Sequence, residues 1–296
     1  MKDELKSLAP RDFPPLLREI PDAPKKLYLR GELPAQSEVE GPNTEHVWLC
    51  VVGSRAITNY GRQAVRHLIA GLRGYPIVIV SGLAYGADAE AHKAALEAGL
   101  PTVAVPGSGL DWSVLYPKAN VNLAKEILKA GGALLSEEEP DAKTMDYMFP
   151  KRNRIMAGLC RATLIIEAKE RSGSLITAKL VTEYNRDLLV VPGSIFSEES
   201  KGTHQFLRLG ATAITRPEEI LQALGIVPRE GPRSLTELRE DLSEEELRVF
   251  EVIKSPVSRD LLIEALALPI TEANVLLSTM EIKGLIVEEL GVVRIR

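Results

Sequence analysis

The sequence predicts an α/β protein built on a parallel β-sheet and followed by a small winged-helix-like domain at the C-terminus. Five short apolar runs rich in β-branched residues each end in a turn rich in glycine and serine. Helix-patterned stretches separate these runs, and the alternation is typical of parallel strands that are buried on both faces. Three short helical patterns and a hairpin pattern then predict the second, smaller domain.

The predicted strands of the sheet are, in chain order, Val47–Val52, Ile77–Val80, Thr102–Val105, Ala162–Ala168 and Leu188–Val191. The helical patterns between them are Arg62–Leu72, Ala87–Ala98, Asn120–Ala130 and Ile176–Asn185. Ligands bind to such sheets where strands end and helices begin. Small residues at this edge leave backbone N–H groups open to an anion, so we expect the edge to hold phosphates.

Composition divides the chain into four parts. Residues 1–40 are rich in proline and predict a short irregular lead-in, with one β-like run at Lys26–Arg30. Residues 41–225 hold all five strands and form the Rossmann-like sheet domain. Residues 226–240 have the glycine and proline content of a linker, and 241–296 form the winged-helix-like domain.

The winged-helix-like domain is predicted from its caps and its β-patterned segments. Ser243 with Glu246 makes a capping box for a helix that ends near Lys254. The elements that follow are a helix after Ser258 that ends at Leu266, a helix from Thr271 to Lys283, and a hairpin of Leu285–Glu288 and Val292–Ile295 around Gly291.

The composition is that of a folded intracellular protein. Hydrophobic residues make up 45% of the chain, and no apolar stretch approaches the roughly 20 residues of a membrane span. The N-terminus lacks the apolar segment of a signal peptide. Cys50 and Cys160 have no metal-ligand spacing, which favours buried reduced thiols. We expect a cytoplasmic protein without a membrane partner, a metal or a cofactor.

Charge is distributed unevenly around a net charge of −5. Residues 143–186 carry nine Lys and Arg against four Asp and Glu, whereas residues 229–296 carry nine against fourteen. A local basic face can bind a polyanion despite an acidic total. A solvated helical face explains the same charges without a ligand.

The turn after the first strand, Gly53-Ser54-Arg55, is a candidate anion site. Ser54 and the backbone N–H groups can donate to a phosphate oxygen, and Arg55 offers a planar fork for bidentate contact. A tight turn with a surface arginine is the alternative. Ser81 and Gly82 after the second strand, and Gly107 after the third, are predicted at the same edge.

The segment Phe149-Pro150-Lys151-Arg152-Asn153-Arg154 combines three cations, an amide and an aromatic ring. The cations can neutralise phosphates while a base stacks on Phe149. The alternatives are a helix start with Phe149 buried and an inward-pointing Arg154. Both alternatives are tested by the position of these side chains.

The turn after the fourth strand, Arg171-Ser172-Gly173-Ser174, can also hold an anion at a helix N-terminus, with Lys179 close by. Glu167 at the end of that strand can orient a sugar or pair with an arginine. Asp88 and His92 are four residues apart on a helix, where a structural pair is commoner than an acid/base or metal site. P-loop, dinucleotide and nucleophile-elbow motifs are missing, which weighs against redox and hydrolase functions.

Six ordered motifs resemble the bacterial DNA processing protein A family, also called Smf. They are VVGSRAITNYG (51–61), VSGLAYGADAEAHKAAL (80–96), VAVPGSGLDWSVLYP (103–117), FPKRNRIMAGL (149–159), EAKERSGSLITAKL (167–180) and VVPGSIFSEESKGTHQFLRLGA (190–211).

The resemblance implies an extended Rossmann fold that binds single-stranded DNA without known catalysis. It further implies that the protein protects incoming DNA, loads the RecA recombinase during natural transformation, and forms a homodimer through the sheet domain. The DNA-binding motifs of the family fall on Gly53-Ser54-Arg55 and Phe149–Arg154. The dimer and recombinase surface falls near His204, Phe206, Leu207 and Ala213.

Two functions of other classes remain open at this point. The fold also resembles the phosphoribohydrolases of cytokinin activation, which act on nucleotide monophosphates through a P-G-G-x-G-T-x-x-E loop. The corresponding segment here, 171–178, lacks the glutamate, which favours binding over turnover. A protein-interaction scaffold centred on the acidic segment 241–296 is the other alternative.

Overall fold

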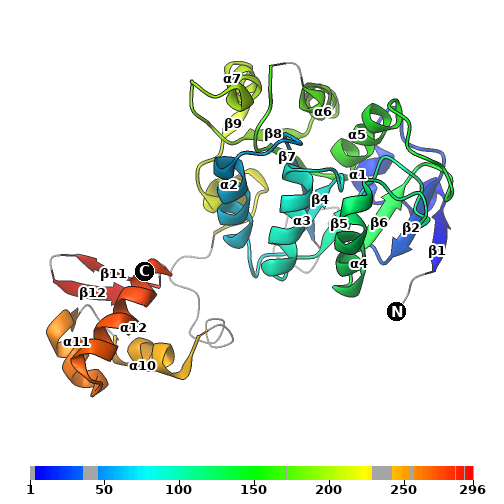
Figure 1. Ribbon diagram of the computed structural model, residues 1–296. Coiled ribbons are helices and arrows are strands. Elements are labelled where there is room, and N and C mark those ends of the chain that lie inside the picture. The colour runs from blue at the N-terminus through cyan, green and yellow to red at the C-terminus, as the bar shows by residue number, and fades with distance from the viewer. Residues whose placement is uncertain are drawn as a thin grey trace. The chain divides into compact units, whose positions relative to one another are not determined.

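The computed structural model describes residues 4–35, 46–170, 172–228, 242–253, 257–283, 285–289 and 291–295. The chain divides into two compact units, residues 1–228 and residues 229–296. The first unit is an α/β domain with a large, mostly parallel sheet, as the sequence predicts, and Figure 1 shows helices on both faces of this sheet.

The sheet of the first unit contains nine strands among the described residues, in the order β1-β2-β6-β5-β4-β3-β7-β8-β9. The last seven strands of this order, from β6 to β9, run parallel to one another. Strand β2 is antiparallel to β6, and β1 is antiparallel to β2. The strands are β1 Leu5–Leu8, β2 Leu27–Gly31, β3 Val47–Val52, β4 Ile77–Ser81, β5 Thr102–Ala104, β6 Ala133–Ser136, β7 Ala162–Ile165, β8 Asp187–Val190 and β9 Thr212–Ala213.

The α-helices that cover this sheet are α1 Pro15–Arg18, α2 Asn59–Ala70, α3 Ala87–Glu97, α4 Val121–Lys129, α5 Met148–Leu159, α6 Gly173–Glu183, α7 Lys201–Arg208 and α8 Pro217–Ala223. Short 3-10 helices lie at Pro10–Asp12, Lys118–Asn120 and Glu198–Ser200. Successive strand residues point to opposite faces, so each strand contributes to two cores. Leu49 and Val51 of β3 pack with α2, α3 and α8, whereas Trp48 and Cys50 pack with α1, α5, α6 and α7.

In the described part of residues 1–40, the predicted β-like run at Lys26–Arg30 is confirmed as β2, but the rest of this segment is not irregular as expected. Strands β1 and β2 extend the sheet beyond β6, and Leu17 of α1 is fully buried in the core beneath α5. Strand β6 was also missed, because its four-residue run leads into acidic residues and not into a glycine turn. Cys50 and Cys160 are buried free thiols in the core beneath α5, in agreement with the prediction.

The strand order reverses direction at β3, because β4 follows on one side and β7 lies on the other. The chain leaves β3 at Gly53 and leaves β7 at Ile166, so two loops diverge at this point. A crevice outside the carboxyl ends of the strands is therefore expected between β3 and β7.

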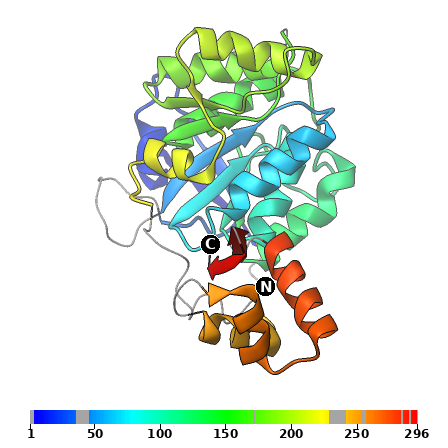
Figure 2. The same cartoon turned by 90° about the vertical axis from the view of Figure 1, so that its left-hand side faces the viewer.

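The second unit contains helices α10 Glu244–Val252, α11 Arg259–Leu266 and α12 Ile270–Ile282, and strands β10 Val257–Ser258, β11 Ile286–Glu289 and β12 Val292–Ile295. The strands form an antiparallel sheet in the order β10-β12-β11. Figure 2 shows the three helices of this unit in orange to red. The predicted capping box of Ser243 and Glu246 is present at the start of α10. The predicted helices and hairpin are confirmed, and β10 is an addition.

Candidate functional site

A cavity of about 290 Å³ opens at the point where the strand order reverses. The turn after β3 forms one wall, helix α5 forms the second, and the start of α6 forms the third. The lining includes the predicted residues Gly53, Ser54, Arg55, Phe149, Arg152, Asn153, Ser172 and Gly173. Four segments that the sequence singled out separately, including the loop after β4 through Ala84 and Asp88, therefore meet in one place.

Phe149 forms a partly exposed aromatic surface beside the cavity. The Arg55 Cζ atom lies 4.7 Å from the centroid of the Phe149 ring, a cation–π contact. Tyr116 meets the same ring edge-on, with 6.0 Å between the centroids. A Cβ atom at Gly107 would lie only 2.7 Å from Phe149 Cδ1, so this position needs glycine. Sequence reasoning missed Tyr116, although it lies within one of the quoted motifs.

The loop after β3 packs closely against the start of α3. Gly86 has a φ of +74°, and a Cβ atom there would lie 2.3 Å from the Ser54 carbonyl oxygen. The Ser54 carbonyl accepts from the Ala87 N–H (3.1 Å), and its hydroxyl accepts from the Ala56 N–H (3.1 Å). These bonds fix the turn, and the Arg55 side chain is left exposed to solvent.

Arg152 lies beneath the cavity and not at its rim. Its guanidinium is buried and donates to the Val105 carbonyl, and its Nε donates to Asn153 Oδ1 at 3.2 Å. Asp88 accepts from the Gly82 N–H at 3.1 Å, and a Cβ at Gly82 would collide with both Asp88 and Arg152. Burial raises the pKa of Asp88, and the positive charge of Arg152 opposes that rise. Arg152 and Asp88 therefore support the floor of the cavity.

The start of α6 offers groups suited to an anion. Ser172 is the N-cap residue, and its hydroxyl is buried with no hydrogen-bond partner among the described residues. Gly173 is exposed at the first helical position. Unpaired N–H groups and the helix dipole favour negative charge there. Arg171 and the side chain of Ser174, also predicted here, lie outside the described residues. Lys179 is exposed further along α6, 3.6 Å from Glu183.

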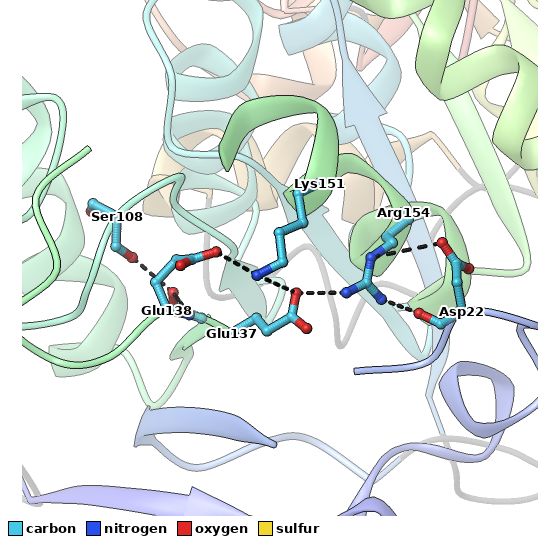
Figure 3. A network of polar contacts seen from close by, with 7 residues as sticks. Asp22, Ser108, Glu137, Glu138, Lys151 and Arg154 are labelled. Atoms are coloured by element: carbon cyan, nitrogen blue, oxygen red, sulfur yellow. Dashed lines mark hydrogen bonds and ion pairs between the residues drawn. The ribbon is translucent and has the colours of Figure 1, made fainter. Parts of the chain in front are cut away.

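Lys151 and Arg154 lie apart from the cavity and face carboxylates (Figure 3). Lys151 Nζ is 3.0 Å from Glu138 and 3.3 Å from Glu137, and Arg154 Nη2 is 2.6 Å from Glu137. Arg154 also donates to the Asp22 carbonyl. Of the six residues from Phe149 to Arg154, the structure places Phe149, Pro150, Arg152 and Asn153 at the cavity.

Three further predicted polar residues are used inside the fold. Ser81 is fully buried and donates to the Val51 carbonyl at 2.6 Å. Glu167 accepts from both the N–H and the hydroxyl of Thr58, the N-cap residue of α2, at 2.9 and 2.6 Å. His92 is buried against Thr102, with 2.7 Å between Nδ1 and Oγ1, and burial lowers its pKa to about 3. The structural interpretation of His92 is therefore supported.

The predicted partner surface is divided between core and exterior. Phe206 is buried in the core beneath α7, and the Leu207 side chain packs against that core. His204 lies 3.1 Å from the Gly193 carbonyl, and Ala213 is exposed on β9. Near these residues in sequence, the exposed apolar side chains are Ile195, Phe196 and Leu209. The sequence motif could not show which of its residues are buried in the core and which are exposed.

The described residues contain no group of three or more His, Cys, Asp or Glu able to hold a metal ion. Within the same residues, no single helix is long and apolar enough to cross a membrane. Helices α11 and α12, taken together as a bent pair, are long and apolar enough to do so by length and composition only.

The family model for DNA recombination-mediator protein A matches residues 5–225, which include every described wall of the cavity. The chain belongs to this family. It is 43% identical to DNA processing protein DprA of Streptococcus pneumoniae over 209 residues, 71% of this chain and 70% of that protein. It is 41% identical to protein Smf of Escherichia coli over 212 residues, which is 72% of this chain but 54% of the length of that protein.

Solved structures of family members have the same fold as this chain. The X-ray structure of DprA from Streptococcus pneumoniae matches with a TM-score of 0.65 at 39% identity, covering 75% of each chain. DNA processing protein A from Helicobacter pylori matches with a TM-score of 0.63 at 30% identity, covering 76% of this chain and 98% of that one. The work on that protein concerns its single-stranded DNA binding mode.

Proposed function

We propose that this protein binds single-stranded DNA and acts as a recombination mediator, protecting incoming DNA and loading the RecA recombinase during natural transformation. The observation that carries the proposal is Arg55 stacked on the half-buried Phe149 at the mouth of the cavity. A cation and an aromatic face on one surface suit a phosphate and a base of the same strand. The Smf and DprA relatives and the Helicobacter pylori structure support this assignment.

Each wall of the cavity has a defined role in the proposed complex. Arg55 and the N–H groups at the start of α6 hold phosphate oxygens. The Ser172 hydroxyl, which is buried and has no hydrogen-bond partner among the described residues, lies beside them at the N-cap. A base stacks on Phe149, whose ring every base can use, so binding is independent of sequence. Phosphate contacts position the strand without reading it.

The carboxylates of the site argue against turnover of a nucleotide monophosphate. Both oxygens of Glu167 accept hydrogen bonds from Thr58, and Asp88 accepts from backbone N–H groups beside Arg152. Neither of these two carboxylates is therefore available as a general base in the cavity. We therefore propose binding without catalysis, in a cytoplasmic homodimer formed through the sheet domain, with the partner surface near His204 and Ala213.

The proposal is tested by titrating a fluorescein-labelled oligothymidine with the full chain at several salt concentrations. We expect binding whose affinity falls linearly with salt on logarithmic axes, because bound phosphates release counterions. A mixed-sequence oligonucleotide of the same length serves as the control and should bind equally well. Absence of salt-dependent binding, or hydrolysis of a nucleotide monophosphate by the same preparation, would overturn the proposal.

A further inference from the structure

Helix α5 has two chemically different sides. Phe149 and Asn153, four residues apart and hence on one side, line the cavity. Lys151 and Arg154, three residues apart, lie on the other side and meet the carboxylates of Glu137, Glu138 and Asp22. Figure 3 shows this second side, with the ion pairs running in a line from Glu138 through Lys151, Glu137 and Arg154 to Asp22.

The ion pairs of this cluster are partly shielded from water. The exposed fraction is 12% for the Arg154 side chain, 17% for Glu137 and 15% for Glu138, while Lys151 is 39% exposed. Although burial alone would lower the pKa of Lys151, the hydrogen bond and charges of Glu138 and Glu137 raise it. The Lys151 ammonium is therefore held in its charged form by fixed neighbours.

The backbone of Glu138 is anchored at the end of β6. The Glu138 N–H donates to the Ser136 hydroxyl at 3.1 Å, and that hydroxyl donates to the Ser108 carbonyl at 2.7 Å. Three carboxylates against two cations leave the cluster with an excess of negative charge. A phosphate that approached Lys151 or Arg154 would also approach Glu137 and Glu138, which repel it.

We propose that Glu137 and Glu138 form an electrostatic boundary that confines the DNA strand to the cavity side of α5. This inference rests on the proposed function. Lys151 and Arg154, although part of the most basic segment of the chain, are held out of contact with phosphates. The boundary makes the path of the strand along α5 one-sided, past Arg55 and Phe149.

The test is a cycle of charge-removing substitutions read by the salt dependence of oligothymidine binding. Each phosphate contact contributes roughly 0.7 to the slope of log affinity against log salt on a single strand. Lys151→Ala alone should change neither the slope nor the affinity. The pair Glu137→Gln and Glu138→Gln should tighten binding and steepen the slope by at least about 0.7. Adding Lys151→Ala to that pair should remove about 0.7 of the gain.

A matched control separates the boundary from a general change in net charge. Glu126 on α4 and Glu218 on α8 are both exposed and line none of the walls described above. Glu126→Gln with Glu218→Gln changes the net charge by the same amount as the boundary pair, and it should leave the slope unchanged. Equal steepening in this control would overturn the boundary.

Two results decide against the inference directly. A lower slope for Lys151→Ala in the otherwise unaltered chain would mean that Lys151 already contacts phosphate. An unchanged slope for the Glu137→Gln and Glu138→Gln pair, with thermal unfolding as in the parent, would mean that these carboxylates set no boundary. If that pair fails to fold, the Lys151→Ala result still decides. Failure of the proposed function itself would show separately. The unaltered protein would then not bind oligothymidine, or Arg55→Ala would have no effect on its binding.

Discussion

Phe149 is a residue for which the sequence leaves two interpretations, a stacking surface for a base and a side chain buried in the core. Its ring is half-buried against Gly107 and Tyr116, yet Arg55 lies on it at the cavity. Phe149→Ala should weaken oligothymidine binding by about 1–3 kcal/mol, because a stacked base is lost. The loss of unfolding free energy should stay below the about 3–5 kcal/mol of a fully buried phenylalanine.

Tyr147→Ala is the matched control for Phe149→Ala, because Tyr147 is 62% exposed and does not line the cavity. Binding isotherms and thermal unfolding of both variants separate the two effects. A large fall in melting temperature with unchanged affinity per folded molecule would place Phe149 in the core and not at the DNA.

Arg55 is expected to hold phosphate without reading bases. Arg55→Ala should weaken binding equally for all oligonucleotide sequences and reduce the salt slope by roughly 0.7. Lys93→Ala, which removes an exposed charge on α3, should leave the slope unaltered. Titrations at four or more salt concentrations provide the measurement. A folded Arg55→Ala protein with parental affinity and slope would remove Arg55 from the site.

His92 gives a prediction for pH dependence. Burial lowers its pKa to about 3, below its ordinary value of 6.5, so the folded state keeps the imidazole neutral. Its stabilising effect is complete above about pH 6.5 and is lost as the pH falls toward about 3, by about 1.4 kcal/mol per unit. His92→Gln should lose less unfolding free energy than the parent between pH 7 and pH 4 in urea titrations. Equal losses would contradict the assignment.

At the scale of elements, Glu167 joins the end of β7 to the start of α2. Both carboxylate oxygens accept from Thr58, and the absence of a Cβ at Gly61 leaves room for one of them. Glu167→Gln should cost about 1.5–3 kcal/mol of unfolding free energy, because a buried bond to a charged group is weakened. The DNA salt slope should not change.

Glu198→Gln, which breaks a surface ion pair with Lys201, is the control for Glu167→Gln and should cost little stability. Chemical unfolding and oligothymidine titration of both variants give the comparison. If Glu167→Gln retained full stability but lost affinity, the carboxylate would face the ligand, as one interpretation of the sequence had it.

The sequence was sufficient to predict the elements with strong local signals. Strand β3 begins and ends where its apolar run does, and helix α11 begins directly after its predicted cap Ser258 and ends at Leu266 as predicted. The missed strands lack such signals. Strand β9 has only two residues, and β1 joins the sheet through antiparallel pairing that no local pattern specifies. Strand β2 coincides with the predicted β-like run Lys26–Arg30, but its antiparallel pairing with β6 was not predicted.

The candidate site likewise has features that the sequence could predict and features that it could not. The turns after β3 and β7 could be predicted from glycine and serine at strand ends, because topology alone brings such ends together. The directions of Lys151 and Arg152 could not be predicted, and for Arg154 an inward direction was predicted only as one alternative. They depend on Glu137, Asp22 and the Val105 carbonyl, all of which lie more than ten residues away in the chain.

At the scale of the whole molecule, the second unit is distinguished by its acidic composition. Residues 229–296 carry fourteen acidic against nine basic residues. Helix α12, whose place in the order of elements is that of a DNA-reading helix, contains neither lysine nor arginine. Arg259 is held by Asn274, Glu281 and Glu288 within the unit. This unit would repel a phosphate backbone instead of releasing counterions from it.

We therefore expect that residues 229–296 are dispensable for binding DNA. The first unit has its own cores on both faces of the sheet and ends at Pro228. A chain that ends at Pro228 should bind oligothymidine within a few-fold of the full-length affinity at matched salt, with the same salt slope. Thermal unfolding would verify that the shortened chain is folded. If it is folded and dimeric yet loses binding at low salt, the second unit does contact DNA, because neither instability nor loss of assembly could then explain the defect. Acidic composition would in that case be a poor guide to which parts of the protein contact the DNA strand.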